Sequence, residues 1–212
     1  MGARRWWEDR ALPRLVDVVL TDATAGGWRR AVTAGLSGDV VELGFGSGRN
    51  LPHYPAAVHR VLAVEPADLA WERARERVGA FGRTVERVGL DGADLPLEDA
   101  SVDAVVTTWT LCTIPDLGAA LAEARRVLRP GGTMRFVEHA LAPGGLTRSA
   151  QRRLQPLWGP VAGGCHLDRD LPSLLDAAGF AVELDHAGFV VPGPMRPWGW
   201  FVLGTAHPDP AG

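Results

Sequence analysis

A glycine-rich stretch near the start of the chain has the residue types of a nucleoside-binding loop. An apolar run ends at Glu42, and Gly44, Gly46 and Gly48 follow at alternate positions. Glycines spaced in this way let the backbone turn sharply after a strand and let a ligand approach main-chain N–H groups without interference from Cβ atoms. The pattern therefore predicts that a nucleoside-containing molecule binds here.

Two other glycine-rich loops do not fit these residues. The dinucleotide fingerprint requires a third glycine where this chain has Arg49, and without it the close helix–strand contact of that fold is lost. The Walker phosphate loop requires a Gly-Lys-Ser/Thr ending, and the chain contains no lysine. An NAD-dependent dehydrogenase is therefore a disfavoured alternative.

The elements that must position the loop alternate between strand and helix, which is typical of a mostly parallel sheet with helices on both faces. Asp116 is expected to cap a helix at 117–128, and Gly179 to close a helix at 171–178. In such a sheet Glu65, at the end of the second strand, would hold the hydroxyl groups of a ribose. Strands are predicted at 39–44, 60–65, 84–89, 102–108, 133–138, 181–187 and 199–205.

Further landmarks follow the glycine loop in an order that is typical of one family. They are Glu65 itself, Asp-Gly-Ala-Asp-Leu-Pro at 91–96, Ser-Val-Asp-Ala-Val-Val at 101–106 and Leu-Arg-Pro-Gly-Gly at 128–132. Over residues 38–140 the chain resembles the class I S-adenosylmethionine-dependent methyltransferases. The resemblance implies an α/β fold, a Rossmann-like three-layer sandwich with a seven-stranded, mostly parallel sheet. It also implies S-adenosyl-L-methionine as cofactor and S-adenosyl-L-homocysteine as product.

The same resemblance assigns roles to individual residues around the cofactor. Glu65 would take the ribose hydroxyls and Asp91 the adenine edge, while Glu42 would either fix the loop or meet the amino group of the methionine moiety. Asp94 is read as a surface acid in a turn. The residues expected to bind the cofactor are Glu42, Gly44, Gly46, Ser47, Gly48, Asn50, Glu65, Pro66, Asp91, Gly92, Thr108 and Trp109.

Shorter motifs narrow the resemblance to one group within the class. The chain is similar, over nearly its whole length, to bacterial ubiquinone-biosynthesis-like methyltransferases related to the mammalian methyltransferase-like alkyl thiol methyltransferases. This likeness implies methyl transfer to a small-molecule acceptor, with a thiol as one lead. A phospholipid or quinone-type N-, C- or O-acceptor and a non-catalytic nucleoside-binding role are the alternatives. The motifs are Gly-Ser-Gly-x-Asn-Leu-Pro-x-Tyr at 46–54, Thr-Leu-Cys at 110–112, Glu-His at 138–139, Pro-Leu-Trp at 156–158 and Gly-Gly-Cys-His-Leu-x-Arg at 163–169.

Two histidines are the candidates for accepting a proton from the acceptor. His139 follows the fifth predicted strand, and His166 lies in the insertion between the fifth and sixth strands. Histidine titrates close to neutral pH and can therefore act as a general base. The alternative is structural for both: His139 would cap the end of its strand, and His166 would support a tight Gly-Gly loop.

Three further residues are candidates for contact with the acceptor. Trp158 could form a wall beside the positive sulfonium or could simply pack. Cys165, like Cys112, could instead be a buried apolar filler. Arg169 could hold an acidic group or could pair with a neighbouring aspartate. No metal site is expected, because a closed zinc site needs a second ligand pair at a recognisable spacing.

Composition and charge give expectations about partners, disulfides and location. The net charge of −3, with mixed signs, argues against a nucleic-acid partner, and two cysteines do not make a disulfide framework. Without a signal-peptide pattern or a run of about 20 apolar residues, the chain is expected in the cytoplasm with no stable membrane insertion. The sequence indicates no oligomeric state.

The chain is expected to form one domain, 1–212, with four parts. These are an N-terminal helical lid at 1–36, a cofactor-binding core at 37–140, a substrate-side insertion at 141–178 and C-terminal strands at 179–207. Within the first part, residues 4–20 carry paired tryptophans among charges, so this segment would be either a lid over the site or a peripheral membrane contact.

Overall fold

The computed structural model describes residues 20–209 of the chain, so the amphipathic helix expected at 4–20 lies almost wholly outside the described residues. One seven-stranded sheet runs through this part of the chain in the order β3-β2-β1-β4-β5-β7-β6. Its strands are β1 (Gly38–Leu43), β2 (Val58–Val64), β3 (Thr84–Gly89), β4 (Val102–Thr108), β5 (Leu128–His139), β6 (Phe180–Phe189) and β7 (Trp200–Pro208).

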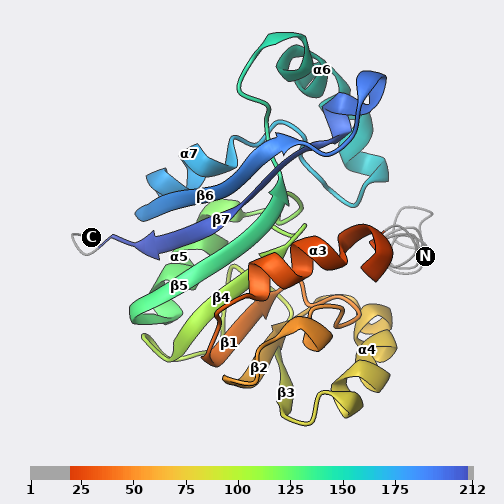
Figure 1. Cartoon of the computed structure of the whole chain (residues 1–212). Helices are drawn as coiled ribbons and strands as arrows, with labels where there is room; N and C mark the ends of the chain where they lie inside the picture. The colour runs from red at the N-terminus through yellow and green to blue at the C-terminus, as the bar shows by residue number, and fades with distance from the viewer. Residues whose placement is uncertain (1–19, 210–212) are drawn as a thin grey trace.

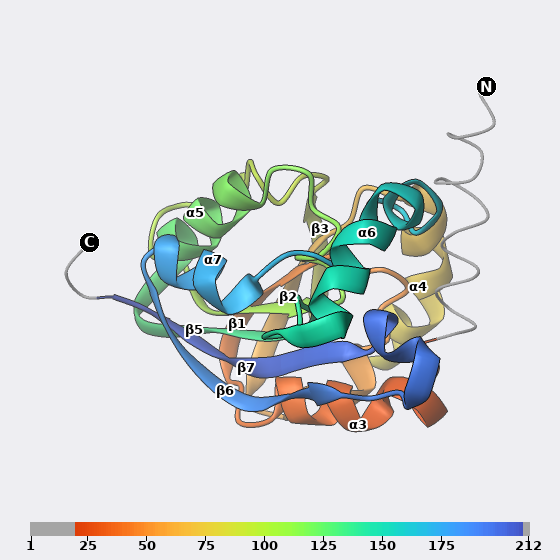
Figure 2. The ribbon, with the colours of Figure 1, turned by 90° about the horizontal axis from the view of Figure 1, so that it is seen from above.

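The first five strands are parallel, and β7 is antiparallel to both of its neighbours, β5 and β6. Helices lie on both faces, with α3 on one side of the sheet and α5 and α7 on the other (Figures 1 and 2). This arrangement confirms the predicted three-layer α/β sandwich. The helices are α3 (Asp22–Thr33), α4 (Asp68–Ala80), α5 (Leu117–Val127), α6 (Gly145–Val161) and α7 (Leu171–Ala177), with short 3-10 turns η2 (Leu51–His53) and η3 (Gly193–Trp198).

The core is divided into two halves by the alternation of side chains along each strand. In β1, Val41 and Leu43 join the half that packs against α5 and α7, whereas Val40 joins the half that packs against α3. Successive strand residues point to opposite faces, so an apolar run such as this one is buried on both sides. The run that precedes the glycine loop therefore fixes β1 at the centre of the sheet.

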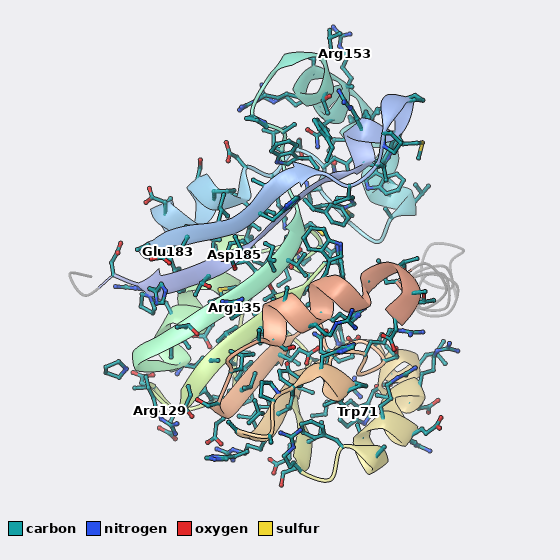
Figure 3. All side chains as sticks on the ribbon, viewed as in Figure 1. Trp71, Arg129, Arg135, Arg153, Glu183 and Asp185 are labelled. Carbon is teal, nitrogen blue, oxygen red and sulfur yellow. The ribbon has the colours of Figure 1, made fainter. Side chains whose placement is uncertain are left out.

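Helix α3 is tied to the sheet by a half-buried arginine on β5. The Arg135 guanidinium donates to the Ala31 carbonyl at 2.9 Å and to the Thr205 hydroxyl at 2.7 Å, and it lies 3.6 Å from the Asp185 carboxylate (Figure 3). These contacts join α3 to β5, β6 and β7. Residues 22–33 thus form part of the helical layer, while the division of the chain into lid, core and insertion stays a prediction.

Helices α5 and α7 were predicted closely, whereas α4 and α6 were not placed. The Asp116 carboxylate accepts a hydrogen bond from the Ala119 N–H at 3.0 Å at the start of α5, and Gly179 follows α7 with a φ of +81°. Helix α6 was not predicted, because Pro156 and Pro160 lie inside it and interrupt the helical pattern. Within residues 20–209, no helix is both long enough and apolar enough to span a membrane.

Candidate active site

The glycine loop after β1 has the backbone conformation that its sequence predicts. Gly44, Gly46 and Gly48 all have positive φ angles, of +69°, +59° and +72°. A Cβ atom on Gly44 would overlap the side chain of Thr110, which follows β4, whereas a Cβ on Gly46 would meet only the Gly44 carbonyl oxygen, at an ordinary contact distance of 3.9 Å. The loop is therefore packed on one side and open on the other, as a backbone cradle for a ligand requires.

Glu65 joins this loop to the carboxyl end of β2. Its Oε2 accepts a hydrogen bond from the Gly46 N–H at 2.7 Å, and its Oε1 accepts one from the Ala67 N–H at 2.8 Å. Burial raises the pKa of Glu65, and the hydrogen bonds from Ala67 and Gly46 oppose this shift. Each carboxylate oxygen has a second lone pair, so the group retains acceptor capacity for a pair of ligand hydroxyls.

Glu42 lies at the centre of a buried polar network beneath the loop. Its carboxylate accepts hydrogen bonds from the Asn50 amide at 2.9 Å and the Tyr54 hydroxyl at 2.7 Å. The Asn50 amide also donates to the Thr108 hydroxyl at 3.2 Å, and its oxygen accepts from Arg29 at 2.9 Å. Burial raises the pKa of Glu42 to about 7, against the hydrogen bond from Tyr54. This geometry favours the first of the two predicted roles, that of fixing the loop.

The remaining predicted cofactor residues surround the same edge of the sheet. Asp91 is exposed after β3, and its carboxylate accepts from the Ala93 N–H at 2.9 Å. Trp109 follows β4 with a φ of +54°, a strained conformation for a large residue, and its ring lies 5.2 Å from the Arg29 guanidinium. Ser47 is buried, and its carbonyl accepts from Arg77 at 3.0 Å.

Two thiols and one imidazole come together beside the loop after β4. We call this group the Cys-His cluster; it consists of Cys112 in that loop, His139 at the end of β5 and Cys165 in the loop before α7. The two Sγ atoms lie 3.7 Å apart, and the Cys165 Sγ lies 3.5 Å from the His139 Nδ1. Both thiols are buried. The other ring nitrogen of His139, Nε2, lies 2.5 Å from the Trp198 carbonyl oxygen.

The Cys-His cluster concentrates negative charge on one sulfur. The hydrogen bond with Cys112, together with the contact with His139, lowers the pKa of Cys165 to about 4 against the effect of burial. The same sulfur–sulfur hydrogen bond, together with burial, raises the pKa of Cys112 well above its usual range. Burial lowers the pKa of His139, but the contacts with Cys165, the Trp198 carbonyl and the charge of Glu138 together outweigh burial and leave that pKa raised.

Glu138 and Arg169 hold the loop after β4 in place next to the cluster. The buried Glu138 carboxylate accepts hydrogen bonds from the backbone N–H groups of Thr110 at 2.9 Å and Cys112 at 3.3 Å, and burial raises its pKa to about 7. The Arg169 guanidinium donates to the carbonyls of Leu111 and Ile114, the latter at 2.7 Å.

The contacts of Arg169 rule out one of its two sequence interpretations, the ion pair with a neighbouring aspartate, while contact with an acidic substrate group stays a prediction. Among residues 20–209, Arg169 forms no ion pair with Asp168 or Asp170, and its fork is occupied by two main-chain carbonyls. The contacts of Arg169 could not be predicted from the sequence, because the partners of its guanidinium are backbone atoms some 55 residues away. Arg169 is therefore a residue that positions the loop after β4.

The structure separates the two histidines that the sequence proposed as bases. His139 belongs to the Cys-His cluster, whereas the His166 ring lies 3.4 Å from the Gln155 amide and 3.5 Å from the Asp168 carboxylate. His166 lines an open cavity of about 420 Å³ beside α6, together with Arg152, Gln155 and Asp168. Trp158, on α6, packs edge-on against Trp198, and the centroids of the two rings lie 6.0 Å apart.

Comparison with known proteins agrees with this geometry. Residues 41–136 match the family model described as a methyltransferase domain. The chain is 34% identical over 183 residues to the thiol S-methyltransferase TMT1B of Homo sapiens, covering 81% of this chain and 72% of that protein. It is 33% identical over 125 residues to the demethylmenaquinone methyltransferase of Clavibacter sepedonicus, covering 57% and 51% respectively.

A solved structure supports the same assignment. The structure titled DhpI-SAM-HEP complex superposes with a TM-score of 0.67 at 22% identity, covering 97% of this chain and 96% of that chain. The fold and the site therefore define a class I S-adenosylmethionine-dependent methyltransferase. More narrowly, the chain belongs to the methyltransferase family that includes the thiol S-methyltransferase TMT1B.

The site fits S-adenosylmethionine as cofactor. The absence of a side chain at Gly46 lets a ligand approach the loop backbone, and the Glu65 carboxylate beside it provides hydroxyl acceptors at the carboxyl ends of β1 and β2, where this fold places its ligands. Sequence reasoning found these residues but missed Arg29 and Tyr54, which complete the network around Glu42. Arg29 belongs to none of the motifs, and Tyr54 ends the motif at 46–54 but acts through a contact with Glu42 that the motif does not reveal.

Proposed function

We propose that the acceptor of this methyltransferase is the thiol of a small molecule. The observation that carries the proposal is the extent of the similarity to the human thiol S-methyltransferase. A match over 81% of a 212-residue chain extends well beyond the methyltransferase-domain match and includes positions 112, 139 and 165. The acceptor side of the site is thus part of the resemblance.

The position of the Cys-His cluster supports the same assignment. Cys112 follows β4 and His139 ends β5, so both lie beyond the carboxyl ends of strands, where ligands bind in open α/β sheets. Trp109, a predicted cofactor residue, follows the same strand as Cys112. An acceptor held by these segments would lie next to the predicted cofactor residues.

The chemistry requires mainly that the acceptor be positioned. S-adenosylmethionine supplies a methyl group that is already activated by a sulfonium charge. The acceptor sulfur forms the new bond to the methyl carbon as the bond between that carbon and the sulfonium breaks, and the thiol proton is released. A free thiol with a pKa of about 8.5 is only a few per cent ionised at neutral pH, so assistance in losing this proton raises the rate.

An acceptor panel tests the proposal. The purified chain is offered alkyl thiols, phenols, quinols and amine-bearing phospholipids in vesicles, and the release of S-adenosylhomocysteine is measured. We expect turnover with thiols that is abolished by Glu65→Ala and retained by Glu76→Ala, an exposed glutamate on α4. Turnover with quinols alone would instead favour the function named for the Clavibacter relative.

The vesicles in the same panel also test whether the chain binds to a membrane surface. The segment at 4–20 is the predicted source of any peripheral membrane contact, and it lies almost wholly outside the described residues. Co-sedimentation of the chain with vesicles, and its loss when Trp6 and Trp7 are replaced by serine, would support that contact. The cytoplasmic location expected from the sequence stays a prediction.

A further inference from the structure

The Cys-His cluster brings together three groups that are metal ligands in many proteins. Cys112, His139 and Cys165 each offer one ligand atom, and these atoms all lie within 4.8 Å of one another. They come from three separate segments: the loop after β4, the end of β5 and the loop before α7. The expectation of no metal site rested on sequence spacing, and this juxtaposition argues against it.

Two of the three distances within the cluster are close to those of a tetrahedral zinc site. Zinc binds sulfur at about 2.3 Å and imidazole nitrogen at about 2.0–2.1 Å, which places tetrahedral ligands about 3.8 Å apart for two sulfurs and about 3.6 Å apart for sulfur and nitrogen. The corresponding distances here are 3.7 Å between Cys112 and Cys165 and 3.5 Å between Cys165 and His139. A disulfide would need its sulfurs at about 2.05 Å.

The orientation of His139 is that of a metal ligand. A carbonyl oxygen can only accept, so the His139 Nε2 that lies 2.5 Å from the Trp198 oxygen must carry a proton and donate it. In the neutral ring this leaves the lone pair on Nδ1, which faces Cys165. Metal-ligating histidines ordinarily donate their other N–H to a carbonyl or carboxylate in this way, because that bond fixes the tautomer and the ring.

The ligand set also identifies the metal. Two thiolates and one imidazole suit zinc, and two thiolate charges neutralise a divalent ion in a site that is otherwise buried. The chain contains only two cysteines, and both are in the cluster. Three protein ligands, as found within residues 20–209, leave a fourth position open, which is the arrangement of catalytic rather than structural zinc sites.

We propose that Cys112, His139 and Cys165 bind a zinc ion whose open position takes the acceptor thiol. The second half of this proposal rests on the proposed thiol acceptor, whereas metal binding itself does not. On binding zinc, the acceptor loses its thiol proton to solvent and is held as a thiolate, because coordination to a metal deprotonates a thiol. A lone pair of that sulfur then forms the new bond to the methyl carbon. His139 is thus a ligand and not the general base.

Cobalt binding tests the site independently of activity. The full chain is reduced, stripped of metal with a chelator and titrated with Co²⁺, which reports thiolate ligands by a charge-transfer absorption and tetrahedral geometry by its visible bands. We expect one Co²⁺ per chain, displaced by Zn²⁺. Cys112→Ser and Cys165→Ser should each weaken the thiolate absorption, and His139→Ala should weaken affinity at least about tenfold.

The control is the neighbouring histidine. His166→Ala should bind Co²⁺ as the parent chain does, because the His166 ring contacts Gln155 and Asp168 and not the cluster. Binding of S-adenosylmethionine by each variant shows that it is folded. If the reduced chain, with both thiols titratable by a thiol reagent, binds no metal or gives no thiolate absorption, the zinc proposal is wrong.

A second titration separates this inference from the proposed function. An alkyl thiol is added to the Co²⁺-loaded chain without a methyl donor, and a change in the visible bands is expected if the thiol occupies the fourth position. An unchanged spectrum would overturn that part of the proposal. Thiol methylation by a metal-free chain at the rate of the zinc-loaded chain would support the proposed function and overturn the role of zinc in holding the acceptor thiol. Stoichiometric metal binding without thiol methylation would support the zinc site and overturn the proposed function.

Discussion

The Glu65 carboxylate accepts a hydrogen bond from the Gly46 N–H at 2.7 Å, so the acid that follows β2 is joined directly to the glycine loop that follows β1. Two segments that lie 19 residues apart in the chain thereby form one surface. The same carboxylate braces the loop and is the predicted acceptor for the ribose hydroxyls. The conformation of the loop and cofactor binding should therefore depend on one side chain.

Glu65→Gln should weaken S-adenosylmethionine binding. The substitution keeps the size of the side chain but removes its charge and one of its two acceptor oxygens. Hydrogen bonds to charged groups contribute about 1.5–3 kcal/mol, so the dissociation constant should rise by roughly 10- to 150-fold. Titration calorimetry measures this change, with Glu76→Gln on α4 as the control, and equal affinities for the two variants would contradict the role given to Glu65.

Gly44→Ala should destabilise the protein more than a matched glycine replacement does. Gly44 and Gly82 share a φ of +69°, but a Cβ on Gly44 would overlap Thr110, whereas a Cβ on Gly82 meets nothing within 4 Å. The strain of a left-handed residue, about 1–2 kcal/mol, is thus common to both variants. Urea unfolding should show an additional loss of at least about 1 kcal/mol for Gly44→Ala. Similar losses would mean that the loop can move away from Thr110.

The stability of the chain should fall as pH rises from about 4.5 to about 7, in part because of Glu42. Its pKa is raised by burial from 4.5 to about 7 in the folded protein. Between these values the folded state holds a proton that the unfolded state has lost, so raising the pH favours unfolding. The contribution of this group is on the order of 3 kcal/mol and is fully lost above pH 7.

Glu42→Gln removes this titration and tests the sign. Unfolding midpoints in urea, measured at a series of pH values, should depend less on pH between 4.5 and 7 in the variant than in the parent chain. The dependence should not vanish, because burial also raises the pKa of Glu138 to about 7. A parent chain that became more stable as pH rose through this range would contradict the buried position of Glu42.

Arg169→Met should loosen the loop after β4. It leaves no charged group without its partner, because the two groups that Arg169 contacts are uncharged carbonyls. The variant leaves the Leu111 and Ile114 carbonyls without their shared donor, and a buried acceptor without a partner costs about 1–3 kcal/mol. Thermal unfolding and amide exchange in the 110–114 loop measure the effect. Arg152→Met, an exposed position on α6, is the control. If both variants unfold at the parent temperature, Arg169 does not position the loop.

The sequence predicted most of the cofactor half of the molecule because the signals there are local. Seven strands were placed to within a few residues at most ends, and the loop at Gly44 and the acid Glu65 follow their strands directly. The start of β5 is the exception, since the strand begins at Leu128 and runs through the Pro-Gly-Gly turn. Patterns of this kind involve residues that are close together in the sequence, so they can be recognised without knowledge of the tertiary packing.

The acceptor half was harder to predict because its contacts are long-range. Cys112 and Cys165 lie 53 positions apart in the sequence but 3.7 Å apart in space, and no spacing rule connects them. Helix α6 was obscured by its two prolines, Pro156 and Pro160. The network around Glu42 likewise depends on Arg29, which reaches Asn50 from a different layer of the sandwich.

The most direct test of the account follows the methyl group to its product. The chain is incubated with S-adenosylmethionine labelled in the methyl group and an equimolar mixture of an alkyl thiol, a phenol and a quinol, and the products are separated and weighed by mass spectrometry. If the acceptor is a thiol, the label will be found in the S-methyl thioether of the added thiol, in an amount equal to the S-adenosylhomocysteine released. Label on the phenol or quinol with none on the thiol would contradict it.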